Sequence, residues 1–133
     1  MIKKKRKGVF TMEKISTTNA PAAIGPYSQG MIVGNLVFTS GQIPVNPADG
    51  TVPEGITAQA EQSCRNVAAV LAAAGSCPEK VIKTTCFLAD MADFAAFNQV
   101  YAKFFPNCPA RSCVAVRELP KQVLCEIVAI AER

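Results

Sequence analysis

The chain has 133 residues, 50% hydrophobic and 18% charged, a size and composition that fit one globular domain able to fold without disulfides or metal. Its formal charge of +4 comes from a basic leader, because all five residues from Lys3 to Lys7 are cations and the chain from Glu13 onward carries nine cations and ten anions. This nearly neutral body gives no electrostatic reason to expect nucleic acid binding, and the absence of histidine excludes Cys-His and Ser-His-Asp nucleophile systems.

Residues 1–12 are expected to form a basic flexible leader ahead of a single domain at 13–133. Sequence upstream of a start at Met12, or a nuclear-import or anionic-surface tag, is an alternative interpretation of the leader. The N-terminus lacks the apolar stretch of a signal peptide, and the longest apolar run, Val67 to Gly75, is about half the length of a membrane span. We therefore expect a cytoplasmic protein that does not enter membranes.

The first third of the chain predicts three strands and a loop. Glu13 to Thr18 has the composition of a short strand, and the Pro/Gly-broken segment from Asn19 to Tyr27 is a loop of the kind that delivers side chains to sites. Residues 31–33 and 36–40 flank Gly34-Asn35 and predict a tight hairpin.

Two helices and a strand follow. The apolar spacing predicts a helix from about Thr57 to Ala74, ended by Gly75, and then a strand from Val81 to Leu88. A second helix is expected between a cap at Asp90 and Pro106. Its aromatic and apolar stripe is expected to be core, and consists of Phe94, Phe97, Val100, Tyr101 and Phe104.

The last two apolar segments each contain a charged residue. Residues 109–116 and 123–130 flank a break at Pro120 and predict a hairpin, with Arg111 in one strand and Glu126 in the other. Desolvating an ion costs several kcal/mol unless a partner compensates, so both groups need each other or a polar ligand. The pattern indicates either a small polar site walled by sheet or a structural ion pair.

We take the register of this hairpin from a pairing of Arg117 with Gln122. In that register Cys113 lies opposite Glu126, and Arg111 becomes a diagonal neighbour of Glu126 on the same face. A slip of one residue would separate the two charged groups.

The element order is therefore β-β-β-α-β-α-β-β, which predicts an α+β fold with a single sheet and both helices on one face. The other face would be left mostly bare and apolar. A bare apolar face on a soluble protein implies self-association.

Six cysteines raise the possibility of disulfides or zinc, but the chain has no C-x-x-C pair and no histidine. We expect most of the cysteines to be reduced core thiols, and no metal. The six residues are Cys64, Cys77, Cys86, Cys108, Cys113 and Cys125. Cys113 differs from the others because it shares a predicted face with Arg111, which would favour the thiolate while burial favours the thiol.

Four blocks of the sequence resemble the RidA (YjgF/Rid) family of reactive-intermediate deaminases, at residues 20–29, 39–44, 94–105 and 109–127. The resemblance implies a chorismate-mutase-like fold and a homotrimer whose sheets pack into a central barrel, with clefts at the subunit interfaces. It also implies hydrolysis of short 2-imino acids, released as enamines by pyridoxal-phosphate-dependent dehydratases, to 2-keto acids and ammonia. No cofactor is expected. The basic leader and the short connection at Pro106-Asn107-Cys108 depart from the family pattern.

The resemblance assigns catalytic roles to two residues that suit them chemically. Arg111 would bind the substrate carboxylate through a bidentate fork that lysine cannot reproduce. Glu126 would accept a proton from, or orient, the water that attacks the imine carbon, and return that proton to the departing nitrogen. Cys113 is expected to contribute a backbone N–H and to shape the pocket.

Further binding residues are implied at matching positions. Tyr27 would border the cleft, Ser40 and Gly41 would present a hydroxyl and a carbonyl to the imine nitrogen, and Asn98 would lie near the cleft. Gly41 also allows another group to approach the backbone closely. The alternatives are a tyrosine that only packs, an ordinary serine at a strand end and an asparagine on a helix surface.

Two other functions remain open at this stage. One is a non-catalytic protein that binds a small carboxylate such as a 2-keto acid, for regulation; Glu126 beside Arg111 argues for turnover, because binding alone needs only the arginine. The other is an RNA-directed translation inhibitor or nuclease, which the near-neutral body and the lack of histidine disfavour.

Overall fold

Six strands form one sheet in the computed structural model, which describes residues 11–133. The strands are β1 (Met12–Ile15), β2 (Gly30–Val33), β3 (Leu36–Thr39), β4 (Val81–Leu88), β5 (Ala110–Ala115) and β6 (Cys125–Glu132). Their order across the sheet is β1-β2-β3-β6-β4-β5. The predicted leader lies outside the described residues, except for its last two positions, and Met12 is the first residue of β1.

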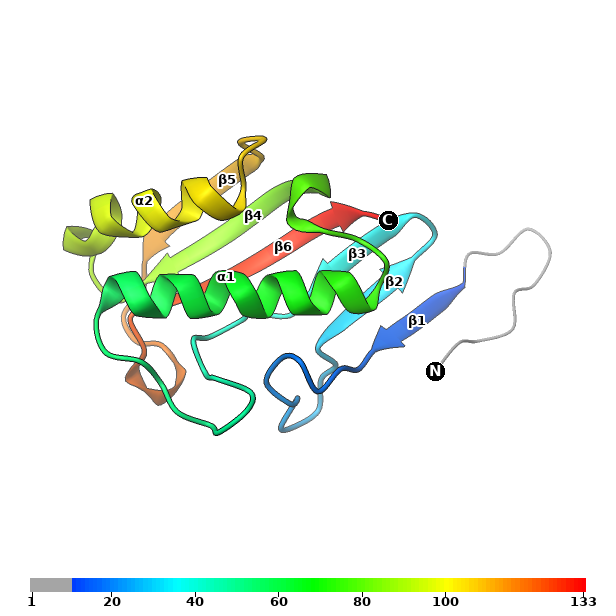
Figure 1. The fold of residues 1–133 in the computed structure, drawn as a ribbon, viewed down its shortest axis with the longest axis horizontal. Coiled ribbons are helices and arrows are strands. Elements are labelled where there is room, and N and C mark those ends of the chain that lie inside the picture. Colours follow the sequence, from blue (N-terminus) through cyan, green and yellow to red (C-terminus); the bar gives the residue numbers. More distant parts are fainter. Residues whose placement is uncertain (1–10) are drawn as a thin grey trace.

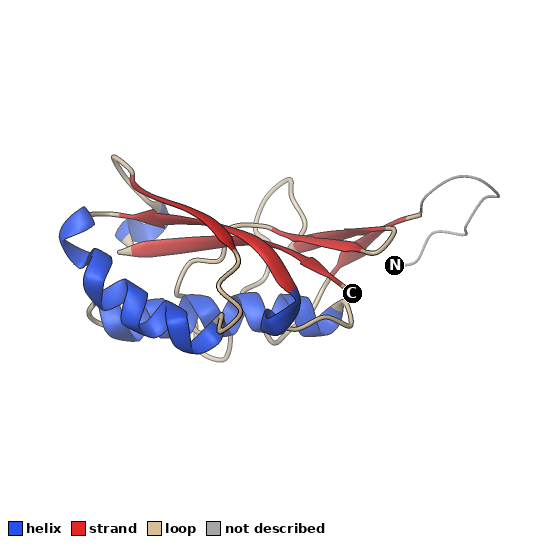
Figure 2. Cartoon of the chain, turned by 90° about the horizontal axis from the view of Figure 1, so that it is seen from above, coloured by secondary structure: helices blue, strands red, loops and turns tan. Residues whose placement is uncertain are grey.

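Both helices, α1 (Ile56–Ala73) and α2 (Phe94–Phe104), cover the same face of the sheet, and Figures 1 and 2 show the opposite face uncovered. Three single 3-10 turns complete the elements, at η1 (Pro78–Lys80), η2 (Met91–Asp93) and η3 (Pro120–Gln122). The predicted element order and the α+β layers are confirmed. Asp90 caps the 3-10 turn η2, which leads into α2, because its side chain accepts a hydrogen bond from the Ala92 N–H at 2.8 Å. The N-cap of α2 itself is Asp93, whose side chain makes no capping bond, so the predicted cap of the helix is wrong.

The core lies between the helices and the sheet. The apolar residues that α1 buries are Ala60, Cys64, Val67, Val70 and Leu71. Phe97 of α2 and Ile127 of β6 are completely buried on the same side. Burial of apolar area at roughly 25 cal/mol per Å² makes this layer the main source of stability.

The predicted hairpin between the last two strands is wrong. β5 pairs with β4 in parallel, and β6 lies between β3 and β4, antiparallel to both. Cys113 is therefore opposite Cys86, and Glu126 is opposite Phe87. A strand, the helix α2 and a second strand form a crossover unit, and such a unit brings its two strands together in parallel. This pattern was visible in the chain order.

The uncovered face carries apolar side chains. Phe38, Ile82 and Val114 are 36%, 45% and 47% exposed. Within residues 11–133, no helix is both long and apolar enough to cross a membrane.

Candidate functional site

The Glu126 carboxylate lies directly against Gly41. An antiparallel bridge pairs Gln42 with Ile127, so the segment after β3 runs beside β6. A Cβ added to Gly41 would lie 2.3 Å from Glu126 Oε2 and 2.7 Å from its Cδ. Only glycine allows the carboxylate to approach the backbone this closely, which agrees with the expectation for Gly41.

Ser40 ties the end of β3 to the loop that carries Tyr27. Its hydroxyl donates to the Ser28 carbonyl at 2.5 Å, and its backbone N–H donates to the Gln29 carbonyl at 2.8 Å. The hydroxyl hydrogen is thus in use, while the oxygen lone pairs can accept from a ligand N–H. Tyr27 itself is 54% exposed, at the rim of this region.

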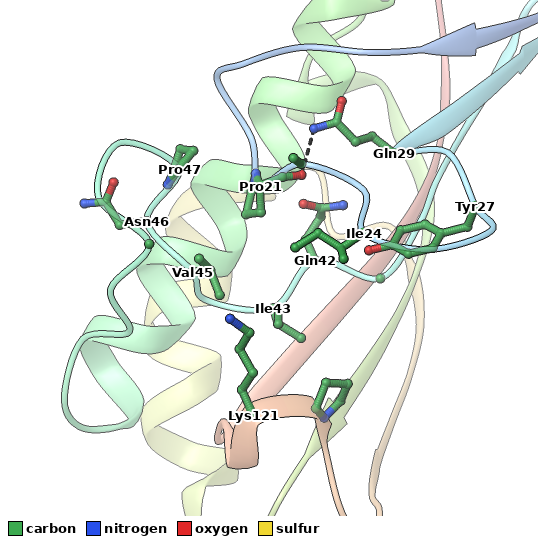
Figure 3. Close-up of a pocket in the computed structure, with 14 residues that line it drawn as sticks. Pro21, Ile24, Tyr27, Gln29, Gln42, Ile43, Val45, Asn46, Pro47 and Lys121 are labelled. Carbon is green, nitrogen blue, oxygen red and sulfur yellow. Dashed lines mark hydrogen bonds between the residues drawn. The ribbon is translucent and has the colours of Figure 1, made fainter.

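Gln29 fixes the shape of that loop, a role that the sequence analysis missed. Its Oε1 accepts from the Thr17 N–H at 2.7 Å, and its Nε2 lies 3.0 Å from the Thr17 carbonyl, 3.2 Å from that of Ala20 and 2.7 Å from that of Pro21. The side chain is 4% exposed, so these bonds satisfy a buried amide. Figure 3 shows the bond between Gln29 and Pro21.

A cavity of about 470 Å³ opens beside these residues. Tyr27, Gly41 and Gln42 line one part of it, and Pro120 and Lys121 line another. Most of its wall is apolar (Figure 3). The volume lies within the range of about 300–1,000 Å³ typical of small-molecule sites.

Arg111 lies elsewhere, at the edge strand β5 and against α2. Its Nη1 donates to Asn98 Oδ1 at 2.8 Å, and its guanidinium carbon lies 4.7 Å from the Tyr101 ring centre and 5.5 Å from that of Phe94. Tyr101 is fixed in turn by a 2.6 Å hydrogen bond with Thr84. Two aromatic faces and one amide oxygen hold the cation in place, and no carboxylate of residues 11–133 forms an ion pair with it.

The helix stripe that carries Phe94 and Tyr101 was expected to be only core. Tyr101 is buried, but together with Phe94 it also supports the arginine. A second, smaller hollow of about 300 Å³ lies at this place, lined by residues that include Asn98, Tyr101, Cys108 and Arg111. Asn98 therefore contacts the predicted site rather than standing on a plain helix surface.

Within one chain, Arg111 and Glu126 are on opposite faces of the sheet. Arg111 contacts α2, whereas Glu126 alternates with Cys125 and Ile127, which are buried under the helices. β4 separates their strands, so the predicted diagonal contact is wrong. Among residues 11–133 the only ion pair is between Glu61 and Arg65. The structure brings together Tyr27, Ser40, Gly41 and Glu126 as one group, and Asn98, Arg111 and Cys113 as the other.

The two groups differ in their proton chemistry. Burial raises the pKa of Glu126 above its usual value. Burial also raises the pKa of Cys113, although nearby Arg111 opposes that shift. A Cys113 thiol with a raised pKa is a poor nucleophile, whereas a carboxylate with a raised pKa is a better base.

All six cysteines are free. Cys64, Cys86 and Cys125 are buried as expected of core thiols, whereas Cys77 and Cys113 are partly buried and Cys108 is exposed. Burial raises the pKa of Cys86 to about 12 and that of Cys125 to about 11. No group of three or more His, Cys, Asp or Glu side chains suited to a metal ion occurs in the described part of the chain.

Comparison with known proteins assigns this architecture to a family. A family model described as Endoribonuclease L-PSP matches residues 17–133. A 2-iminobutanoate/2-iminopropanoate deaminase of Escherichia coli (strain K12) is 54% identical over 123 residues, which cover 90% of this chain and 96% of that protein. A protein of Lactococcus lactis subsp. lactis described as the putative regulator AldR is also 54% identical, over 91% of this chain and 98% of that protein.

Solved structures show the same fold. The crystal structure of E. coli TdcF with bound serine superposes with a TM-score of 0.88 at 50% sequence identity. The match covers 91% of this chain and 98% of that chain.

Proposed function

Because the chain belongs to the Endoribonuclease L-PSP family, the RidA (YjgF/Rid) family indicated by its motifs, we propose that it hydrolyses short 2-imino acids to 2-keto acids and ammonia. The observation that carries this proposal is the half-buried Glu126 carboxylate, held against Gly41 beside a cavity, with a raised pKa. A protein that only bound a carboxylate would have no use for such a base. The E. coli relative that is 54% identical is described as a 2-iminobutanoate/2-iminopropanoate deaminase, which acts on the same class of compound.

The reaction would take place between two copies of the chain. Arg111 and Glu126 face opposite sides of one sheet, so one small substrate can contact both only if they come from different subunits. Glu126 is on the uncovered apolar face, where self-association is expected, and Arg111 is on the edge strand β5. We propose a homotrimer in which the uncovered faces form a central barrel and three clefts each combine the two groups of residues.

In such a cleft Arg111 would bind the substrate carboxylate. Asn98, Phe94 and Tyr101 already hold the guanidinium without neutralising it, so little ordering is needed when the anion arrives. Each charge-assisted hydrogen bond would contribute about 1.5–3 kcal/mol. Cys113 would shape the same end of the cleft and form no covalent bond.

The proton chemistry would fall to Glu126. Its carboxylate would take a proton from a water molecule as that water attacks C2 of the iminium, and would then return it to the nitrogen that leaves as ammonia. Ser40 and Gly41 would accept from the imine N–H, through the hydroxyl oxygen and the backbone carbonyl, and Tyr27 would border the substrate. Water supplies the oxygen of the keto acid, and no cofactor or metal takes part.

The family description mentions a ribonuclease, and one relative is described as a putative regulator. The chain has no histidine for general acid-base cleavage of RNA, and its body from Glu13 onward is nearly neutral. Regulation by binding a keto acid would need Arg111 but not the Glu126–Gly41 contact. We therefore prefer catalysis.

The test couples a purified serine or threonine dehydratase to this protein and follows 2-keto acid formation while semicarbazide competes for the imine. We expect faster keto acid formation and less semicarbazone, and loss of both effects in Glu126→Gln. The Arg111→Lys variant should be poorly active because its ammonium cannot make the bidentate contact. No acceleration over buffer would reject the enzyme and leave the binding function.

A further inference from the structure

We propose that the cavity beside Gly41 receives the side chain of 2-imino dicarboxylic acids, and that the Lys121 ammonium binds their distal carboxylate. This rests on the proposed function and names a substrate class beyond the short imino acids. Its evidence is the shape, wall chemistry and charge of the cavity.

The cavity begins where the reaction would occur. Gly41, which contacts the Glu126 carboxylate, and Tyr27 both belong to its lining. A substrate whose imine carbon lies beside Glu126 would therefore have this space within reach of its side chain. A methyl or ethyl group would fill only a small part of about 470 Å³.

The walls suit a chain of methylene groups. Ile24, Ile43 and Val45 present apolar surface to the space (Figure 3). Pro120 also belongs to the lining. No aspartate or glutamate is among the residues that line it. Polar lining groups such as the Gln29 amide are already bonded to the protein.

Among the described residues that line the cavity, Lys121 alone carries a formal charge. Its side chain runs along Ile43 toward Val45, away from Tyr27 (Figure 3). It makes no ion pair with any residue in the described range 11–133. Lys121 is an exposed residue. An ammonium beside apolar walls without an anion is complementary to a ligand carboxylate at the far end of an apolar chain.

The backbone directs Lys121 to this place. Lys121 and Gln122 both have left-handed conformations, with φ of 57° and 54°. The turn is closed by hydrogen bonds from the Gln122 N–H to the Leu119 carbonyl at 3.0 Å and from the Val123 N–H to the Pro120 carbonyl at 3.3 Å. Such a conformation is uncommon for residues other than glycine and is maintained here at a position that orients a charged side chain.

The experiment compares two substrates that have side chains of similar length but different charge, together with a third that has a short side chain. Imino acids are generated in situ by flavin amino-acid oxidases from glutamate, methionine and 2-aminobutanoate, and keto acid formation is measured against semicarbazide trapping. We expect Lys121→Met to lower the ratio of kcat/KM for the glutamate-derived over the methionine-derived substrate by about tenfold. Methionine is unbranched and only one atom shorter than lysine, so it keeps the backbone strain of the turn and most of the apolar contact while it removes the ammonium.

The matched control is Lys80→Met, which removes an exposed lysine from the other turn that begins with proline, η1. It should leave the ratio unchanged. A second variant, Ile43→Phe, narrows the cavity and should disfavour both long substrates relative to the short one. An unchanged ratio in Lys121→Met overturns the proposal.

A binding measurement separates this proposal from the proposed function. Calorimetric titration with 2-oxoglutarate and with 2-oxobutanoate does not require turnover. We expect tighter binding of 2-oxoglutarate, and loss of that preference in Lys121→Met. A preference for 2-oxoglutarate without any deamination would support the proposed role of the cavity and reject the proposed enzymatic function. Deamination of short substrates with no preference for either keto acid would support the enzymatic function and reject the role of the cavity.

Discussion

At the scale of single residues, the site depends on close contacts that leave no room for substitution. Gly41 was expected to let another group approach the backbone, and the Glu126 carboxylate occupies that space. The partner could not be identified from the sequence, because the contact joins residues 85 positions apart through the bridge between Gln42 and Ile127.

Gly41→Ala should lower kcat/KM for short imino acids by about 10²-fold, because the new methyl group must displace the Glu126 carboxylate. The melting temperature should change little, since the displaced atoms are the flexible end of a side chain. Gly75→Ala is the control. Its added Cβ meets nothing within 4 Å but has φ of 78°, so it should lower stability by about 1 kcal/mol and keep activity. Full activity in Gly41→Ala would contradict the role of this contact.

Glu126→Gln should be inactive and yet more heat-stable at neutral pH. Burial raises the pKa of Glu126 in the folded chain above its unfolded value, so the folded state binds this proton more tightly. This contribution to the free energy of unfolding is fully present below the pKa of Glu126 in the unfolded chain. It is lost as the pH rises through the pKa of Glu126 in the folded chain. In thermal unfolding from about pH 4 to pH 8, the melting temperature of the glutamine variant should increase relative to that of the native chain as the pH rises. An equal difference at every pH would mean that Glu126 does not titrate in this way.

Asn98→Asp should raise KM by about tenfold with a smaller change in kcat, because a carboxylate at 2.8 Å from Arg111 Nη1 would compete with the substrate carboxylate. Asn98→Ala removes the acceptor without adding charge and serves as the comparison. Steady-state kinetics of the two variants test the idea. The same KM in both would show that the neutrality of Asn98 is irrelevant.

At the scale of elements, local sequence patterns predicted the helices and strands but did not predict which strands pair. The strand Val81–Leu88 and the order of all eight helices and strands are confirmed, because they depend on periodicity and on breaks such as Gly75 and Pro106. The hairpin was wrong because apolar strands next to each other in the chain need not pair, and β4 competes for both. Once β4 lies between them, Arg111 and Glu126 turn to different faces.

The helix layer should also control cysteine reactivity. Cys108 is exposed, Cys113 is half-buried with a raised pKa, and Cys64, Cys86 and Cys125 are buried between the helices and the sheet with raised pKa values. Iodoacetamide should therefore modify Cys108 first and Cys113 slowly, and should reach Cys64, Cys86 and Cys125 only after unfolding. Mass spectrometry of timed digests measures the order. Early labelling of Cys113 would point to an activated thiol.

At the scale of the whole molecule, the proposed sharing of the site between copies predicts that two inactive variants complement each other. A mixture of Arg111→Ala and Glu126→Gln chains, unfolded and refolded together, would contain clefts with an intact arginine from one chain and an intact glutamate from its neighbour. In equal mixtures about one cleft in four would be complete, given a closed ring of identical contacts. Keto acid formation by the mixture should rise to a corresponding fraction of native activity, while each variant refolded alone stays inactive. No recovery in mixed oligomers would place both groups in one chain.

The hydrogen bonds of the Gln29 side chain affect how quickly a ligand can be captured. One amide holds three carbonyl groups and an N–H of the Thr17–Pro21 segment, so the rim near Tyr27 keeps its form through bonds that no ligand supplies. A rim that is already ordered does not have to close before the reaction begins. The entropy cost of ordering this segment arises during folding and not each time a ligand binds. For the unstable imino acids proposed as substrates, a preformed rim removes loop closure as a step that would slow capture.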